Sequence, residues 1–261
     1  MKSIKKAIGK LDAFFQDRPS RQGVLARQSI GKEKAGDKEL TELLCSAGGA
    51  RTRMDGSIGD SLIDTAWAAW ELMDLGIDSL NGGLSRLIAW VLTKVEAAQP
   101  FVVPVPLTLP SGVVFPVADD ATLAARCLGV RVLVRAHQGE RPAVAREIEA
   151  IATAPQPATL NLSASVLSAL ALAPPAHRHH LDGLVNRLGG AQNADGGWTG
   201  ADLFHMLEAL VLAGIRPARA VVARAAPALL ALQHDSGAFD EPANEERALI
   251  GMRALLVAAE D

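Results

Sequence analysis

A seven-residue pattern near the C-terminal end occurs twice and constrains the fold more than any other feature. Residues 192–198 read Gln-Asn-Ala-Asp-Gly-Gly-Trp, and residues 233–239 read Gln-His-Asp-Ser-Gly-Ala-Phe. Both fit Gln-x-x-x-Gly-x-aromatic, and a leucine precedes each glutamine by four positions. Asp55-Gly-Ser-Ile58 is a looser relative. Repeats with a period near forty residues indicate a fold made by stacking one helical unit.

Two kinds of helix alternate between these patterns. One kind is apolar nearly all round, and we expect it at 64–75, 119–134, 162–173, 202–213 and 245–258. The other has a clear polar face, and we expect it at 84–98, 142–152, 180–192 and 218–233. A helix that is apolar all round is buried, whereas a helix with a charged stripe faces water. Short connections make neighbouring helices antiparallel. The pattern therefore predicts one all-α domain over 1–261, with an inner and an outer ring of five to six hairpins and the inner N-terminal ends at one mouth.

Composition excludes several classes of protein. Apolar residues form 49% of the chain and the formal net charge is −3, which is typical of a globular protein and favours neither disorder nor nucleic-acid binding. No segment approaches the roughly 20 apolar residues of a membrane span. Cys45 and Cys127 lack the spacing of a metal site. We expect a cytoplasmic protein with no metal and no cofactor; composition leaves its oligomeric state unknown.

Two segments depart from the repeat. Residues 1–20 predict an amphipathic helix, in which the lysines of residues 1–17 favour either peripheral membrane contact or docking on the chain's own domain. Residues 99–116 hold five prolines, which exclude helix and predict a loop that crosses one end of the ring. That loop is either a plain connection or a partial cover for a cavity. Residues 18–37 are polar and predict a mobile loop.

The repeated Gln-x-x-x-Gly-x-aromatic element resembles the QW motif of squalene–hopene and oxidosqualene cyclases. In that family the glutamine and the aromatic ring tie neighbouring outer helices together. The resemblance covers 188–198 and 229–239, although Arg187 and Ala228 replace the upstream aromatic residue of the motif. It implies a single-domain α/α toroid of the terpenoid cyclase and prenyltransferase superfamily. Because the motif is structural, it implies little about chemistry.

The same resemblance implies catalytic acids. Protonating cyclases carry Asp-x-Asp-Asp at the start of an inner helix, and here Asp119 and Asp120 match the last two acids while Val117 replaces the first. In the family the acid that matches Asp119 protonates an alkene or epoxide. Neighbouring carboxylates help to keep one of them protonated. The alternative is that both aspartates only complement the start of the helix.

Further residues are candidates for contact with a substrate. Asp64, Trp67, Phe115, Phe204 and His205 lie on or beside the predicted inner helices. Aromatic faces stabilise a carbocation. His205 either is a core residue with its hydrogen bonds satisfied or lies at the mouth, bonded to Asp119 or Glu245. The segment around His205 also resembles the zinc-binding β subunits of protein prenyltransferases. The preceding inner helix supplies neither the aspartate nor the cysteine of that site, so the ligand set for zinc is incomplete.

Two functions follow from the resemblance. The first is a terpene cyclase-like enzyme that holds an isoprenoid chain in the toroid cavity and begins cyclisation by protonation from Asp119. The alternative is a non-catalytic toroid that binds an isoprenoid, a lipid or a protein partner. The chain has four Trp, six Phe and no Tyr, a small supply of aromatic rings for a C30 substrate. A shorter isoprenoid, or another apolar small molecule, is therefore expected.

Overall fold

The computed structural model describes residues 2–97 and 103–260, and within them the chain forms twelve α-helices and one two-stranded sheet. The helices are α1 (Lys2–Phe15), α2 (Arg21–Ser29), α3 (Asp37–Arg51), α4 (Leu62–Asp74), α5 (Gly82–Glu96), α6 (Ala118–Arg135), α7 (Pro142–Thr153), α8 (Leu160–Ala171), α9 (His179–Gly190), α10 (Leu203–Ala213), α11 (Arg216–Leu232) and α12 (Glu245–Glu260). A 3₁₀ turn, Pro175–His177, precedes α9. The strands β1 (Leu107–Thr108) and β2 (Val114–Phe115) are antiparallel and pair Leu107 with Phe115. The predicted all-helical class is confirmed.

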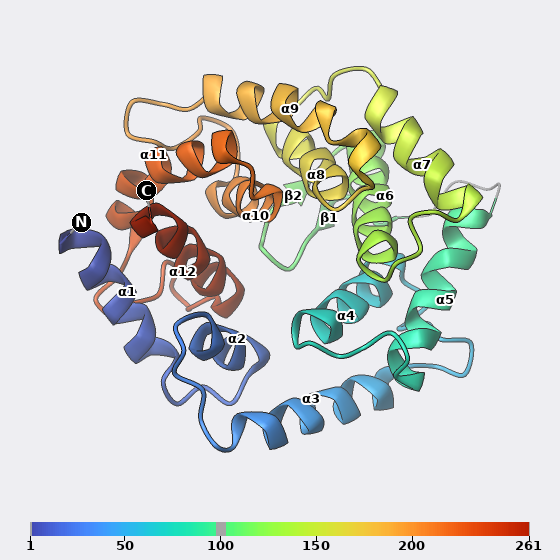
Figure 1. Ribbon diagram of the computed structural model, residues 1–261, viewed down its shortest axis with the longest axis horizontal. Coiled ribbons are helices and arrows are strands. Elements are labelled where there is room, and N and C mark those ends of the chain that lie inside the picture. The colour runs from blue at the N-terminus through green and yellow to red at the C-terminus, as the bar shows by residue number, and fades with distance from the viewer. Residues whose placement is uncertain (1, 98–102, 261) are drawn as a thin grey trace.

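The helices form two layers around a common centre (Figure 1). The even-numbered helices lie nearer the centre, and the odd-numbered helices lie outside them. In the inner layer α4 packs on α6, α6 on α8, α8 on α10, α10 on α12 and α12 on α2. The first helix, α1, packs on α11 and α12, so the two ends of the chain meet.

The contrast between α4 and α5 illustrates why the layers form. Ser61 caps α4, since its hydroxyl accepts a hydrogen bond from the Asp64 amide at 3.2 Å. Most of α4 is buried, on several faces of the helix. The outer helix α5 buries one stripe, Leu84, Leu87, Ile88 and Val91, and exposes residues such as Arg86. Stripes at this spacing fix one face of a helix against the interior.

The turn glycines of the repeat have a common role. Gly56, Gly196 and Gly237 have φ values of +93°, +90° and +93°. A Cβ at Gly196 would lie 2.0 Å from the Arg224 carbonyl oxygen of α11, and a Cβ at Gly237 would lie 2.4 Å from the Lys10 carbonyl oxygen of α1. Each turn therefore presses its glycine against the next outer helix, where no side chain fits.

The repeat glutamines join the same helices. Gln192 donates to the Gly196 carbonyl at 2.8 Å and to the Val221 carbonyl of α11 at 3.1 Å. Gln233 donates to the Gly237 carbonyl at 3.2 Å and to the Ala7 carbonyl of α1 at 3.0 Å. Both glutamines thus tie a turn to a neighbouring outer helix, the role that the QW resemblance implies.

The N-terminal region differs from its prediction. The first helix ends at Phe15 rather than near residue 20. Residues 18–37 are not a loop throughout, because they contain α2, whose buried Arg27 pairs with Asp37. The apolar face of α1, which includes Leu11, is buried against the protein. That face therefore docks on the chain's own domain and is not free to meet a membrane. Among the described residues no helix is long and apolar enough to cross a bilayer.

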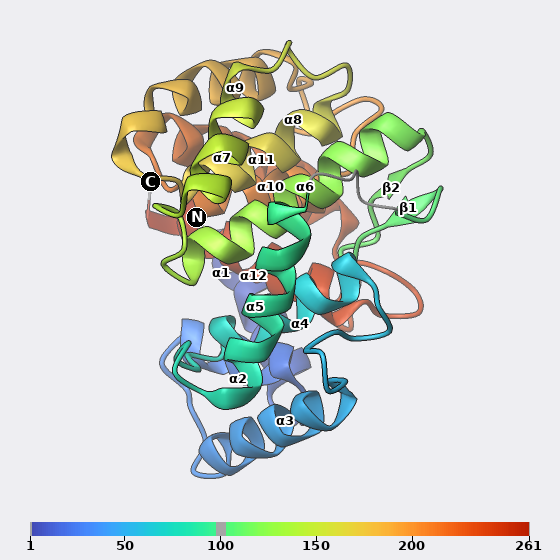
Figure 2. The same ribbon diagram turned by 90° about the vertical axis from the view of Figure 1, so that its right-hand side faces the viewer.

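The proline-rich segment lies at one end of the two layers (Figure 2). Residues 99–102 of this segment lie outside the described residues. The remainder forms the β1–β2 hairpin, held to α12 by a 2.7 Å hydrogen bond that Arg247 donates to the Ser111 carbonyl. Leu109 and Ser111 at its tip line a cavity between the inner helices, so the segment is a partial cover.

Candidate functional site

Two adjoining cavities occupy the centre of the inner layer. The first, here called the hairpin pocket, encloses an empty space of ≈ 340 Å³, part of it open to solvent, and is lined by Trp67, Leu109, Ser111, Ala124, Cys127, Leu128, Arg131, Ser165, Ser168, His205 and Glu208. The second, the arginine chamber, encloses ≈ 480 Å³ on the same measure and is lined by Trp70, Asp74, Arg131, Arg135, Glu208, Val211, Leu212, Glu246, Ile250 and Arg253. Arg131 and Glu208 belong to both.

The order of the lining residues gives the direction of the inner helices. On α4 the hairpin pocket takes Trp67, and the arginine chamber takes the later residues Trp70 and Asp74. On α10 the same shift runs from His205 to Leu212. The described inner helices that line both cavities, α4, α6 and α10, therefore point the same way. The hairpin pocket lies toward their N-terminal ends and the arginine chamber toward their C-terminal ends.

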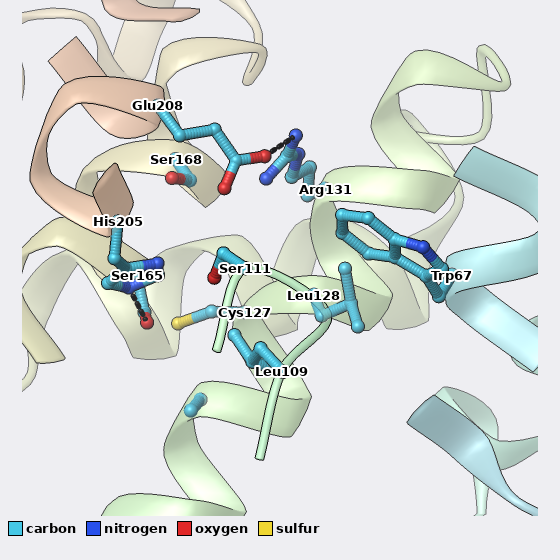
Figure 3. A pocket seen from close by; sticks show the side chains of 11 residues that line it. Trp67, Leu109, Ser111, Cys127, Leu128, Arg131, Ser165, Ser168, His205 and Glu208 are labelled. Carbon is cyan, nitrogen blue, oxygen red and sulfur yellow. Dashed lines mark hydrogen bonds and ion pairs between the residues drawn. The ribbon is translucent and has the colours of Figure 1, made fainter. Parts of the chain in front are cut away.

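An ion pair separates the two cavities. Arg131 of α6 donates a 2.6 Å hydrogen bond to Glu208 of α10, and both side chains are largely buried (Figure 3). Burial pushes the pKa of Glu208 upward, but the charge and hydrogen bond of Arg131 together with the neighbouring His205 and Arg253 outweigh this effect, and the net pKa is lower than usual. Glu208 is therefore ionised at neutral pH. Its charge compensates a guanidinium that has little contact with water.

His205 is fixed as a neutral imidazole. Burial lowers its pKa, and its Nε2 lies 3.0 Å from the Ser165 hydroxyl and 3.1 Å from the Asn161 carbonyl oxygen. Because a carbonyl oxygen can only accept, the proton resides on Nε2. The other nitrogen, Nδ1, then carries a lone pair, and Figure 3 shows it on the side of the pocket. This nitrogen can accept a hydrogen bond from a ligand.

Three buried polar atoms of the hairpin pocket have no hydrogen-bond partner among the described residues. They are Ser111 Oγ, Arg131 Nε and His205 Nδ1, on side chains that are at most 5% exposed. A buried polar atom left unpaired costs about 1–3 kcal/mol. They come from the hairpin, α6 and α10, and they line one cavity together with Trp67, Leu109 and Leu128. The arrangement suits a ligand with a polar group and an apolar body.

The central aromatic rings already face cations. The Arg131 and Arg135 guanidinium carbons lie 3.6 Å and 4.3 Å from the centre of the Trp70 ring. The Arg247 guanidinium carbon lies 5.0 Å from the centre of Phe204, which also packs against Phe239. These ring faces are therefore not free to stabilise a carbocation. Charged side chains thus occupy the centre beside the aromatic rings.

The structure does not bring the predicted acids into either cavity. Asp119 is exposed and Asp120 half-buried in the first turn of α6, and neither lines the hairpin pocket. Neither aspartate is the N-cap, which is Val117. Asp64 is exposed at the start of α4, also outside both cavities. The catalytic role of the two aspartates stays a prediction.

The predicted contact residues divide into two groups. Trp67 and His205 line the hairpin pocket. Phe115 supports it from β2, with its ring edge-on to His205 at 6.0 Å between centres. Phe204 is buried against Phe239 and lines neither cavity. The predicted bond from His205 to Asp119 or Glu245 is wrong, since Ser165 and Asn161 contact the imidazole.

Cys127 also lines the hairpin pocket, but its thiol is unreactive at neutral pH. Burial raises the pKa of its thiol to about 12. Since the thiolate is the nucleophile, a thiol that stays protonated at neutral pH is a packing group. Within residues 2–97 and 103–260, no three His, Cys, Asp or Glu side chains are grouped to hold a metal ion.

No protein-family model matches the chain, and no curated protein matches its sequence. The chemistry of the site is therefore argued from its own residues.

Proposed function

We propose that this chain is an α/α toroid, related in architecture to the terpenoid cyclases, that binds a short oxygenated isoprenoid in the hairpin pocket. It belongs with the non-catalytic binding proteins of that architecture. The ligand places its hydroxyl among Ser111, Arg131 and His205, and its hydrocarbon chain against Trp67, Leu109 and Leu128.

The three unpaired atoms carry this proposal. Arg131 Nε can only donate a hydrogen bond, His205 Nδ1 accepts one, and Ser111 Oγ does both. An alcohol oxygen donates one hydrogen bond and accepts two, so it can satisfy all three atoms. A bound hydrocarbon would displace water from these atoms and pair with none of them, which disfavours its binding.

Two observations favour binding over cyclisation. The acid that the resemblance assigns, Asp119, is exposed and outside the pocket. The acid that does line the pocket, Glu208, is an ionised carboxylate paired with Arg131 and therefore not a proton donor. The cavity volume of ≈ 20 Å³ leaves no room for a C30 chain.

Calorimetric titration with a C10 prenyl alcohol and with the acyclic C10 hydrocarbon tests the proposal. The alcohol is expected to bind, and the hydrocarbon to bind at least tenfold more weakly. Ser111→Ala removes one partner of the oxygen and is expected to weaken alcohol binding about three- to tenfold, as for the loss of one neutral hydrogen bond.

Ser85→Ala is the matched control, because Ser85 is exposed on the outer helix α5. Its affinity for the alcohol should equal that of the wild type. Equal binding of hydrocarbon and alcohol, or full binding by Ser111→Ala, would show that these atoms do not hold the ligand.

A further inference from the structure

The arginine chamber is a second site, built differently from the hairpin pocket. Arg131 and Arg135 reach it from α6 and Arg253 from α12, with Val211, Leu212 and Ile250 as the apolar part of the wall. Trp70 stacks against Arg131 and Arg135 and holds both in place. We propose that this chamber binds the carboxylate of a small organic acid whose hydrocarbon part lies on that apolar wall.

The arginines of the chamber share too few acceptors. Asp74 alone faces three guanidinium groups, those of Arg21 at 3.2 Å, Arg253 at 3.3 Å and Arg135 at 3.6 Å. Strong charge-assisted hydrogen bonds are about 2.7–2.9 Å long. None of the three pairs reaches that length, so Arg135 and Arg253 keep donor capacity for another anion.

The remaining acids are engaged elsewhere. Glu208 compensates Arg131, and Glu246 is bonded to Arg21 and Gln22. Glu71, the fourth acid, faces Arg21 at 3.3 Å from outside the chamber and is about a third exposed. Three arginines and three acids thus line the chamber, and Arg21 and Glu71 add one charge of each sign beside it.

The raised pKa of one acid moves the balance of charge in the chamber toward positive. Burial raises the pKa of Glu246, which reduces the negative charge that it contributes. Burial, with the neighbouring charges of Arg131 and Arg253, lowers the pKa of Arg135 despite Asp74. A bound anion would favour the charged form of Arg135.

The apolar wall selects the kind of anion. A carboxylate can take two parallel hydrogen bonds from a guanidinium group, and its alkyl chain can cover Val211, Leu212 and Ile250. Inorganic phosphate meets the arginines equally well but leaves that wall uncovered. A neutral alcohol covers the wall but does not compensate the arginines. These three probes therefore separate the contributions of charge and of apolar contact.

Calorimetric titration of the full chain with hexanoate, hexanol and inorganic phosphate tests the proposal. Hexanoate is expected to bind more tightly than the other two. Arg253→Gln should weaken hexanoate binding roughly ten- to a hundredfold, as for the loss of a hydrogen bond to a charged group. Arg253→Lys keeps the charge but not the paired donors of the guanidinium group. Its affinity for hexanoate should lie between those of the wild type and Arg253→Gln.

Arg219→Gln is the matched control, because Arg219 pairs with Glu260 on the exposed outside. It should bind hexanoate as the wild type does, and so should Ser111→Ala of the hairpin pocket. Circular dichroism verifies the fold of each variant, and Arg253→Lys serves alone if Arg253→Gln unfolds. The proposal would be overturned if hexanol bound as tightly as hexanoate or if phosphate bound more tightly. It would also be overturned if the Arg253 variants bound hexanoate as the wild type does, or if Ser111→Ala bound it more weakly.

Discussion

Arg131 and Glu208 face each other across the centre of the molecule, joined by a 2.6 Å hydrogen bond between helices α6 and α10. This pair divides the central space into a pocket with three unpaired polar atoms and a chamber rich in arginine. A centre organised by charge differs from the hydrocarbon-lined hollow that cyclisation of an isoprenoid requires.

Removal of one partner of this pair should strongly destabilise the fold. Glu208→Ala leaves the Arg131 guanidinium buried without its carboxylate, so the free energy of unfolding is expected to fall by about 3–5 kcal/mol in urea denaturation. Glu260→Ala, at the exposed pair with Arg219, should cost less than about 1 kcal/mol. The double variant Arg131→Met, Glu208→Leu should recover much of the loss. Equal costs at the two sites would contradict a buried, mutually dependent pair.

The repeat turn makes a steric prediction. Gly196→Ala requires a Cβ at φ +90° and 2.0 Å from the Arg224 carbonyl oxygen, so the loss should exceed the roughly 1–3 kcal/mol of backbone strain alone. Gly200→Ala is matched, since Gly200 has φ +74° with no atom within 4 Å of the added Cβ. Thermal unfolding should show a clearly larger loss for Gly196→Ala. A loss no greater than that of Gly200→Ala would mean that α11 moves aside freely.

His205 should make stability depend on pH in a defined direction. Burial lowers its pKa below the usual value of 6.5, so near pH 6 the unfolded chain binds a proton that the folded chain does not. The free energy of unfolding should therefore fall as pH decreases from 7 through 6.5, by at most about 1.4 kcal/mol per pH unit from this one group.

Urea titrations at pH 7 and pH 5.5 measure how much free energy of unfolding each protein loses on acidification, and the loss in a variant is compared with that in the wild type. His205→Gln should show less loss on acidification than the wild type. His234→Gln, a change on the exposed surface, should keep the wild-type slope. Greater acid sensitivity in His205→Gln would reverse the assigned sign.

Asp119 supplies the prediction that separates binding from catalysis. It is exposed in the first turn of α6, where a negative charge complements the helix N-terminus. Asp119→Asn should cost about 0.3–1 kcal/mol of stability and leave binding of the C10 alcohol unchanged. Gas chromatography should recover the alcohol unaltered from both proteins. A cyclised product that disappears in Asp119→Asn would restore the catalytic reading.

The helical layers could be predicted because their cause is local. Apolar periodicity predicted the inner helices close to their observed bounds. For example, α10 was expected at 202–213 and spans 203–213. The turn glycines and glutamines lie at fixed offsets, so a repeat is visible in one sequence. The helix α2 was missed because it is short and five of its nine residues are polar. Its buried apolar residues, Val24 to Ala26, are consecutive and show no helical spacing, and its buried Arg27 pairs with Asp37.

The ionic centre could not be predicted, because its partners are far apart in the chain. Arg131 and Glu208 are 77 residues apart, and Arg21 and Glu246 are 225 apart. One signal was present: Arg131 stands between Val130 and Val132 in an apolar run. A charge in such a place requires a buried partner, although sequence alone does not identify it.

A crystal structure of the complex with the C10 prenyl alcohol tests the central claim most directly. The account predicts the alcohol oxygen within hydrogen-bond distance of Ser111 Oγ, Arg131 Nε and His205 Nδ1, with the chain against Trp67 and Leu128. Density for the alcohol beside Asp119, or a hairpin pocket left empty at saturating alcohol, would contradict it.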